Sequence, residues 1–179
     1  LVMDRSQKSS QICQLLAYFC LLVLGGCAGT DTQTRTTTQY CAGIESLVKS
    51  YENGFRDVRG KTAVNGHLVD VWRTDVQLVG NNCELWQWGG NQVTYVCSKT
   101  FPNKELSQET YQRAKDVIET CLPEWGHLET TRKLGEGTKV LYQRDGQLPG
   151  VAVHTVATPR LFTSEWTTYV FVGDPSDQL

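Results

Sequence analysis

Residues 83–97 read Cys-Glu-Leu-Trp-Gln-Trp-Gly-Gly-Asn-Gln-Val-Thr-Tyr-Val-Cys, two runs of strand-forming residues around a Gly-Gly-Asn turn. A turn of this kind between alternating apolar and polar residues is typical of a β-hairpin. If the turn centres on Gly90, three pairs of residues lie opposite each other: Cys83 and Cys97, Leu85 and Tyr95, and Gln87 and Val93. The stretch therefore predicts an antiparallel hairpin that turns one face towards a core.

Two helices are expected outside this hairpin. Apolar residues recur at helical spacing over residues 41–58 and again over residues 108–122. Ser107 is a favourable N-cap for the second helix, and Leu106 and Tyr111 are placed as a hydrophobic staple. Pro123 ends this helix, because proline lacks the backbone N–H that a helix needs.

The remaining patterns predict strands over residues 68–79, 83–88, 92–99, 127–134, 139–144, 151–158 and 166–172. With the helices, the order along the chain is α-β-β-β-α-β-β-β-β. This order predicts an α+β fold, in which an antiparallel sheet of about six or seven strands carries two helices on one face. No internal repeat at solenoid or propeller spacing is visible.

The N-terminal segment has the features of an export signal. Arg5 and Lys8 precede an apolar run at residues 12–24, which is shorter than the ~20 residues that a transmembrane helix needs. The run ends at Leu24-Gly25-Gly26-Cys27, a sequence that resembles the lipobox of bacterial lipoproteins: an aliphatic residue, two small residues and a cysteine. An ordinary secretory signal, cut near Gly26 or Ala28 and leaving Cys27 free, is the alternative.

The resemblance to bacterial lipoproteins implies cleavage before Cys27 and acylation of its sulfur and its new amino group. Two or more acyl chains would anchor the chain stably to a membrane. By family analogy, Ala28 favours the outer membrane. We expect the domain on its periplasmic side, with the inner membrane and the cell surface as alternatives. The expected organisation is a signal peptide at 1–26, the lipidated cysteine with a flexible Thr-rich tether at 27–39, and one globular domain at 40–179.

The chain has seven cysteines, and four of them lie in the expected domain. An even number in an exported domain predicts two disulfides. The helix and hairpin patterns favour Cys41–Cys121 with Cys83–Cys97, and Cys41–Cys83 with Cys97–Cys121 stays open. The cysteines have neither a Cys-x-x-Cys motif nor the paired close spacing of a zinc site, so no metal is expected.

Composition and motifs exclude several classes of function. A formal net charge of −2 gives no broad basic field, so we expect no nucleic-acid partner. Residues 54–62 resemble a phosphate loop only superficially, because five residues separate the glycines where the motif needs four, so we expect no nucleotide and no cofactor. His67, His127 and His154 have no His or Cys three or four residues away, and Gly-x-Ser-x-Gly is absent. We therefore expect no catalytic residues and no enzymatic activity. The alternative is an enzyme whose catalytic residues are dispersed along the sequence.

The tryptophans give the one indication of a binding site. If Leu85 faces the helices, Trp86 and Trp88 point to the opposite face, and Trp72 is a candidate to join them from the preceding strand. Exposed clustered aromatics often mark a partner site. The alternative is that the four C-terminal strands fold over this face and bury the tryptophans in the core.

These observations predict a non-enzymatic envelope lipoprotein, held at the membrane by Cys27, that binds or helps to assemble a protein partner of the cell envelope. A second hypothesis is a periplasmic inhibitor or immunity protein against a hydrolase or toxin. Such a protein needs a protruding loop, and residues 154–165, with Pro159 and Arg160, are the candidate.

Overall fold

The computed structural model describes residues 36–66, 68–89, 92–132, 135–159 and 164–175. The expected signal peptide, Cys27 and residues 28–35 of the expected tether lie outside the described residues. The described helices are α2 (Thr37–Ser50) and α3 (Lys104–Cys121), with short 3-10 turns η1 (Tyr51–Asn53) and η2 (Arg56–Val58). The strands are β1 (Thr62–Asn65), β2 (Val69–Arg73), β3 (Asn82–Trp88), β4 (Val93–Phe101), β5 (Gly126–Thr131), β6 (Gly137–Gln143), β7 (Gly150–Pro159) and β8 (Ser164–Gly173).

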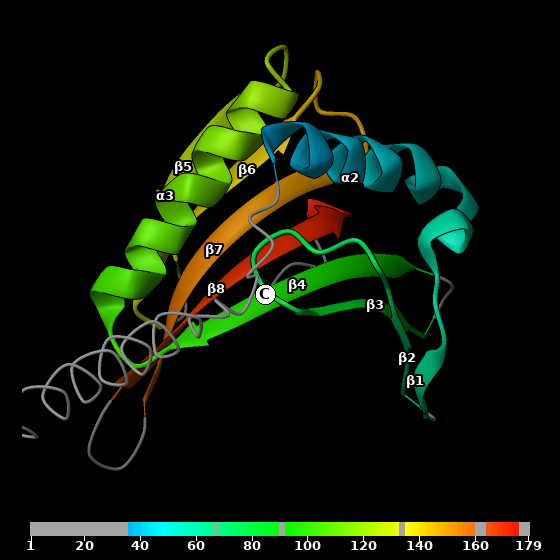
Figure 1. Cartoon of the computed structure of the whole chain (residues 1–179), viewed down its shortest axis with the longest axis horizontal. Coiled ribbons are helices and arrows are strands. Elements are labelled where there is room, and N and C mark those ends of the chain that lie inside the picture. Colours follow the sequence, from blue (N-terminus) through cyan, green and yellow to red (C-terminus); the bar gives the residue numbers. More distant parts are fainter. Residues whose placement is uncertain (1–35, 67, 90–91, 133–134, 160–163, 176–179) are drawn as a thin grey trace, which may run out of the picture. The chain divides into compact units, whose positions relative to one another are not determined.

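All eight strands form one antiparallel sheet in the order β1-β2-β3-β4-β8-β7-β6-β5. Helices α2 and α3 lie on the same side of this sheet (Figure 1). The α+β class and the antiparallel sheet are therefore confirmed. The predicted strand number and order are wrong, because four strands, not three, lie between the two helices.

The missed strand is β1. All four of its residues are exposed, so it lacks the alternation of apolar and polar residues from which a half-buried strand is recognised. The segment predicted as one strand over residues 68–79 also ends earlier, at Arg73. The residues that follow form the connection between β2 and β3.

The predicted hairpin register is confirmed. Strands β3 and β4 pair as expected, with Cys83 opposite Cys97, Leu85 opposite Tyr95, and Gln87 opposite Val93. Gly90 and Asn91 of the predicted turn lie outside the described residues. Disulfides join Cys41 to Cys121 and Cys83 to Cys97, with Cα atoms 4.9 Å and 4.0 Å apart, which is the pairing that the sequence favours.

Helix α2 begins within the segment expected to be a tether. The Thr36 side chain accepts a hydrogen bond from the Gln39 backbone, and the Gln39 side chain accepts one from the Thr36 backbone. This capping box satisfies backbone N–H groups at the helix start, so the boundary at residue 39 is wrong. At its other end, the predicted helix over 41–58 stops at Ser50, because Gly54 and Phe55 adopt left-handed conformations.

Each helix is followed by a four-stranded antiparallel meander. Helix α2 leads into β1–β4, and helix α3 leads into β5–β8. The two meanders join side by side through β4 and β8 to form the continuous sheet. The main core lies between this sheet and the two helices, with Leu47, Leu85, Tyr95 and Val153 among its fully buried side chains.

Candidate functional site

The helix-free face of the sheet carries the aromatic residues that the sequence singled out. Leu85 and Tyr95 belong to the core beneath the helices, so their neighbours along the strands point the other way. We define the helix-free face by the side chains that alternate away from the helices in β2, β3, β4, β7 and β8: Val71, Glu84, Trp86, Trp88, Val96, His154, Tyr169 and Phe171.

Trp86 and Trp88 form a fixed pair on this face. Their ring centroids are 5.6 Å apart in an edge-to-face arrangement. The Trp86 indole Nε1–H donates a 2.9 Å hydrogen bond to Glu84 Oε2, which holds the ring in one orientation. Trp88 stays 39% exposed. The pair thus offers aromatic surface that is already ordered before any partner arrives.

The expectation that Trp72 joins this pair is wrong. Trp72 is opposite Leu85 in the β2–β3 register, so it lies on the helix side of the sheet, where it packs against the core. The guanidinium carbon of Arg59 lies 3.9 Å from the centre of its ring. Which side chains of β2 face the helices depends on its register with β3. The 74–81 connection sets this register, and no local sequence pattern predicts it.

The four C-terminal strands do not cover the tryptophans. They continue the same sheet beyond β4, with β8 next to it. They also add aromatic residues that the sequence analysis missed, because Val96 is paired with Phe171 and Ser98 with Tyr169 across the β4–β8 junction. The Tyr169 and Phe171 rings are stacked, with centroids 5.6 Å apart. The sequence could have indicated this pair, because residues two apart in a strand point to the same face of the sheet.

A polar hollow opens where β2 ends and β3 begins. Its volume is about 370 Å³. Arg73 and Glu84, which are opposite each other in the register, lie at its edge, and the connection between the two strands supplies most of the rest. The polar lining side chains include Arg73, Asp75, Gln77, Asn81, Asn82 and Glu84.

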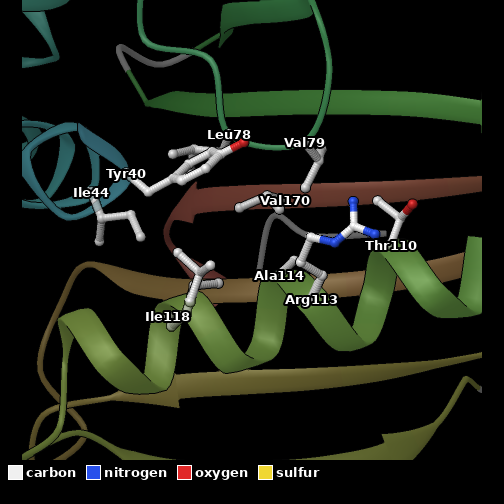
Figure 2. A pocket seen from close by; sticks show the side chains of 10 residues that line it. Tyr40, Ile44, Leu78, Val79, Thr110, Arg113, Ala114, Ile118 and Val170 are labelled. Carbon is white, nitrogen blue, oxygen red and sulfur yellow. The ribbon is translucent and has the colours of Figure 1, made fainter. Parts of the chain in front are cut away.

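A second, apolar pocket lies between the two helices and the β2–β3 connection. Figure 2 shows Ile44 and Ile118 at one end of it and Thr110 and Arg113 at the other. Its volume is about 60 Å³, well below the roughly 300–1,000 Å³ of small-molecule sites. Arg113 already forms a 2.7 Å ion pair with Glu109. This pocket has room for a few apolar groups and not for a ligand.

Tyr111 and Glu129, two groups with perturbed pKa values, join helix α3 to strand β5. The Tyr111 hydroxyl donates a 2.7 Å hydrogen bond to Glu129, and Lys115 forms a 2.6 Å ion pair with the same carboxylate. Burial and then the Glu129 carboxylate raise the pKa of Tyr111 above its ordinary range, whereas Lys115 and Tyr111 lower the pKa of Glu129. Because none of these groups lines the polar hollow or the apolar pocket, we assign them a structural role.

The histidines are dispersed. His127 lies near Tyr142 on the helix side, with ring centroids 5.7 Å apart, and His154 lies near Phe171 on the helix-free face, 4.9 Å apart. His67 falls outside the described residues. Among the described residues, no group of three or more His, Cys, Asp or Glu side chains could hold a metal ion.

The loop expected at residues 154–165 is much shorter in the structure. His154 to Pro159 belong to β7, and β8 begins at Ser164. Strands β7 and β8 pair as a hairpin up to Pro159 and Ser164, so most of the predicted loop belongs to these two strands. Arg160, named with Pro159 in this candidate loop, lies outside the described residues.

None of the helices in the described part of the chain combines the length and the apolar character needed to cross a membrane. Comparisons of the chain with protein-family models, with curated proteins and with solved structures give no match.

Proposed function

We propose that this chain is a lipid-anchored lipoprotein of the bacterial cell envelope, without enzymatic activity, that binds a protein partner through the helix-free face. The lipid would be attached to Cys27, on the basis of its lipobox-like sequence. The outer membrane, with the domain on its periplasmic side, is the proposed location.

The observation that carries the proposed binding role is the ordered pair Trp86 and Trp88 on a sheet face that no described helix covers. Tryptophan is among the residue types enriched at the interface positions that dominate binding energy. Trp88 is exposed and Trp86 half-buried, whereas Val71, Val96 and His154 of the same face are buried, so the part of the face open to a partner centres on the two tryptophans.

Site-specific photo-crosslinking in intact cells tests the binding face. A photoreactive residue at position 88 should give a discrete crosslinked product with an envelope protein. The matched control is position 106, because Leu106 is also an exposed apolar residue, 42% exposed against 39% for Trp88, but lies on α3. Equal products at both positions, or none at position 88, would contradict the proposal. A hydrolase as the crosslinked protein would favour the inhibitor hypothesis.

Cys27→Ser tests the proposed anchor separately. The variant should move from the membrane fraction to the soluble fraction, because it has no thiol for acylation. Mass spectrometry of the wild-type protein should find added acyl mass on Cys27 as the first residue. Retention of Cys27→Ser in the membrane fraction would show that lipidation at this residue is not the anchor.

A further inference from the structure

We propose that the polar hollow between β2 and β3 binds a saccharide chain whose pyranose rings extend onto Trp86. This inference goes beyond the proposed protein-binding role and does not depend on it. The hollow lies at the β2–β3 end of the helix-free face, and Glu84 belongs both to the hollow and to the contact that orients Trp86, so the two proposed sites share Trp86.

The size and lining of the hollow fit a ligand rich in hydroxyl groups. Its volume of about 370 Å³ lies within the range of small-molecule sites. Amides, carboxylates and one guanidinium line it, so it offers both hydrogen-bond donors and acceptors. A sugar hydroxyl is both donor and acceptor, and therefore matches such a mixed lining better than a group that only donates or only accepts.

Charge argues against an anionic ligand. Asp75 and Glu84 contribute two carboxylates to the lining, and Arg73 contributes the only guanidinium among the described lining residues. A phosphate or carboxylate in the hollow would meet more negative than positive charge. A neutral polyhydroxyl ligand pays no such cost.

The hollow is held in shape before any ligand binds. The Tyr95 hydroxyl donates a 2.9 Å hydrogen bond to the Val76 carbonyl, and the Val76 N–H donates one to the Thr74 hydroxyl. Val76 and Leu78 of the same connection pack against the core, whereas the polar residues of the connection line the hollow. At the β3 side, the Cys83–Cys97 disulfide joins the lining to β4.

Trp86 supplies the second requirement of saccharide binding, an apolar surface. A pyranose ring has a polar rim and apolar C–H faces, and the negative face of an indole attracts such C–H groups. Glu84 and Trp86 point to the same face of β3, two residues apart. A chain longer than one ring can therefore place one ring among the polar groups and the next against the indole.

Titration of the full-length chain in detergent micelles with two tetrasaccharides, one of β-1,4-linked N-acetylglucosamine and one of β-1,4-linked glucose, tests the proposal. Calorimetry measures affinity, and saturation-transfer NMR identifies sugar protons close to the protein. Binding of the N-acetylated chain alone supports a cell-wall type of amino sugar, and binding of the glucose chain supports a hexose glycan. No binding of either at roughly 10 mM would overturn the proposal.

Three variants locate the site. Asp75→Ala and Asn82→Ala each remove one exposed polar group of the hollow, and Trp86→Leu removes the aromatic surface; each should weaken binding roughly tenfold. Asp116→Ala on α3 and Leu128→Ala on β5 are matched controls away from the hollow and should bind like the wild type. Equal affinity in all five variants would contradict this site, and crosslinking at position 88 would be unaffected by that result.

Discussion

A buried serine hydroxyl joins helix α3 to the centre of the sheet. The Ser107 side chain is fully buried, and its Oγ lies 2.9 Å from the hydroxyl oxygens of both Thr155 and Thr168. The sequence predicted Ser107 as the N-cap of this helix, but Asn103 has that role, accepting a hydrogen bond from the Leu106 backbone. The helix starts earlier, and Ser107 therefore faces strands β7 and β8 from within it.

We predict that Ser107→Ala lowers the free energy of unfolding by about 1–3 kcal/mol, because it removes a shared hydrogen-bonding partner from two buried threonine hydroxyls. Urea unfolding followed by circular dichroism measures the change. Thr120→Ala, an exposed hydroxyl on the same helix, is the control and should change stability by less than about 0.5 kcal/mol. A loss no greater than that of the control would show that the buried network contributes little.

The Glu129 carboxylate gives stability that depends on pH. Its hydrogen bonds from Lys115 and Tyr111 lower its pKa in the folded state. A group with a lowered folded pKa stabilises the fold above its unfolded pKa of about 4.3, and this stabilisation is lost as the pH falls through the folded pKa. The effect should be below about 1 kcal/mol, because solvent screens a side chain that is 43% exposed.

We predict that Glu129→Gln removes this part of the acid sensitivity. Between about pH 5 and pH 3, the melting temperature of the variant should fall less than that of the wild type. Thermal unfolding at a series of pH values measures the difference. Glu109→Gln, which removes the carboxylate of an exposed ion pair on the same helix, is the control. Parallel pH profiles for wild type and Glu129→Gln would contradict the assigned role.

The two disulfides act on different elements. Cys41–Cys121 joins the two helices and closes a loop with a sequence separation of 80, whereas Cys83–Cys97 joins neighbouring strands with a separation of 14. In the chain-entropy model, a crosslink stabilises the fold by restricting the unfolded chain, and the longer loop gives the larger effect. Cys41–Cys121 thus joins two helices that belong to different halves of the chain.

We predict that Cys41→Ala with Cys121→Ala costs about 4.5 kcal/mol of unfolding free energy, and Cys83→Ala with Cys97→Ala about 3 kcal/mol. Guanidinium unfolding of the two double variants measures the difference. Each variant should retain the other disulfide by peptide mass mapping without reduction. Greater loss in the hairpin variant would indicate that native packing around Cys83, not loop length, determines the ranking.

At the scale of the whole molecule, the two helix-plus-meander halves meet at the middle of the sheet. Strands β4 and β8 each have a hydrogen-bonded neighbour on both sides, whereas β1 and β5 form the two edges and are exposed along their whole length. The most buried strands are β7 and β8, in each of which six of the ten residues are buried. Stability should therefore decrease from the central strands to both edges.

Hydrogen exchange of the folded chain tests this gradient. We predict that the backbone amides of β4, β7 and β8 exchange most slowly and those of β1 and β5 most quickly, because local opening of an edge strand exposes little apolar surface. Mass spectrometry of exchanged peptic fragments resolves these strands. Protection of β5 equal to that of β8 would show that another part of the chain or a second molecule covers this edge.

Local patterns in the sequence determined the hairpin of residues 82–101, its register and the existence of both helices. The turn residues and the strict alternation around Leu85 and Tyr95 leave one pairing that buries the apolar side chains, and the structure has it. The opposite orientation of Trp86 and Trp88 follows from the same alternation. These features depend on residues close together in the chain.

Only the tertiary structure decided that β8 lies beside β4, that Trp72 faces the helices, and that a polar hollow opens between β2 and β3. Each of these features depends on how separate segments of the chain meet. The repeated arrangement of one helix and four strands has no periodic sequence pattern that predicts it. The start of α3 belongs to the same group, because Ser107 suits an N-cap locally and is buried only when strands β7 and β8 are present. Local propensity specifies elements, whereas burial against distant partners specifies their limits and neighbours.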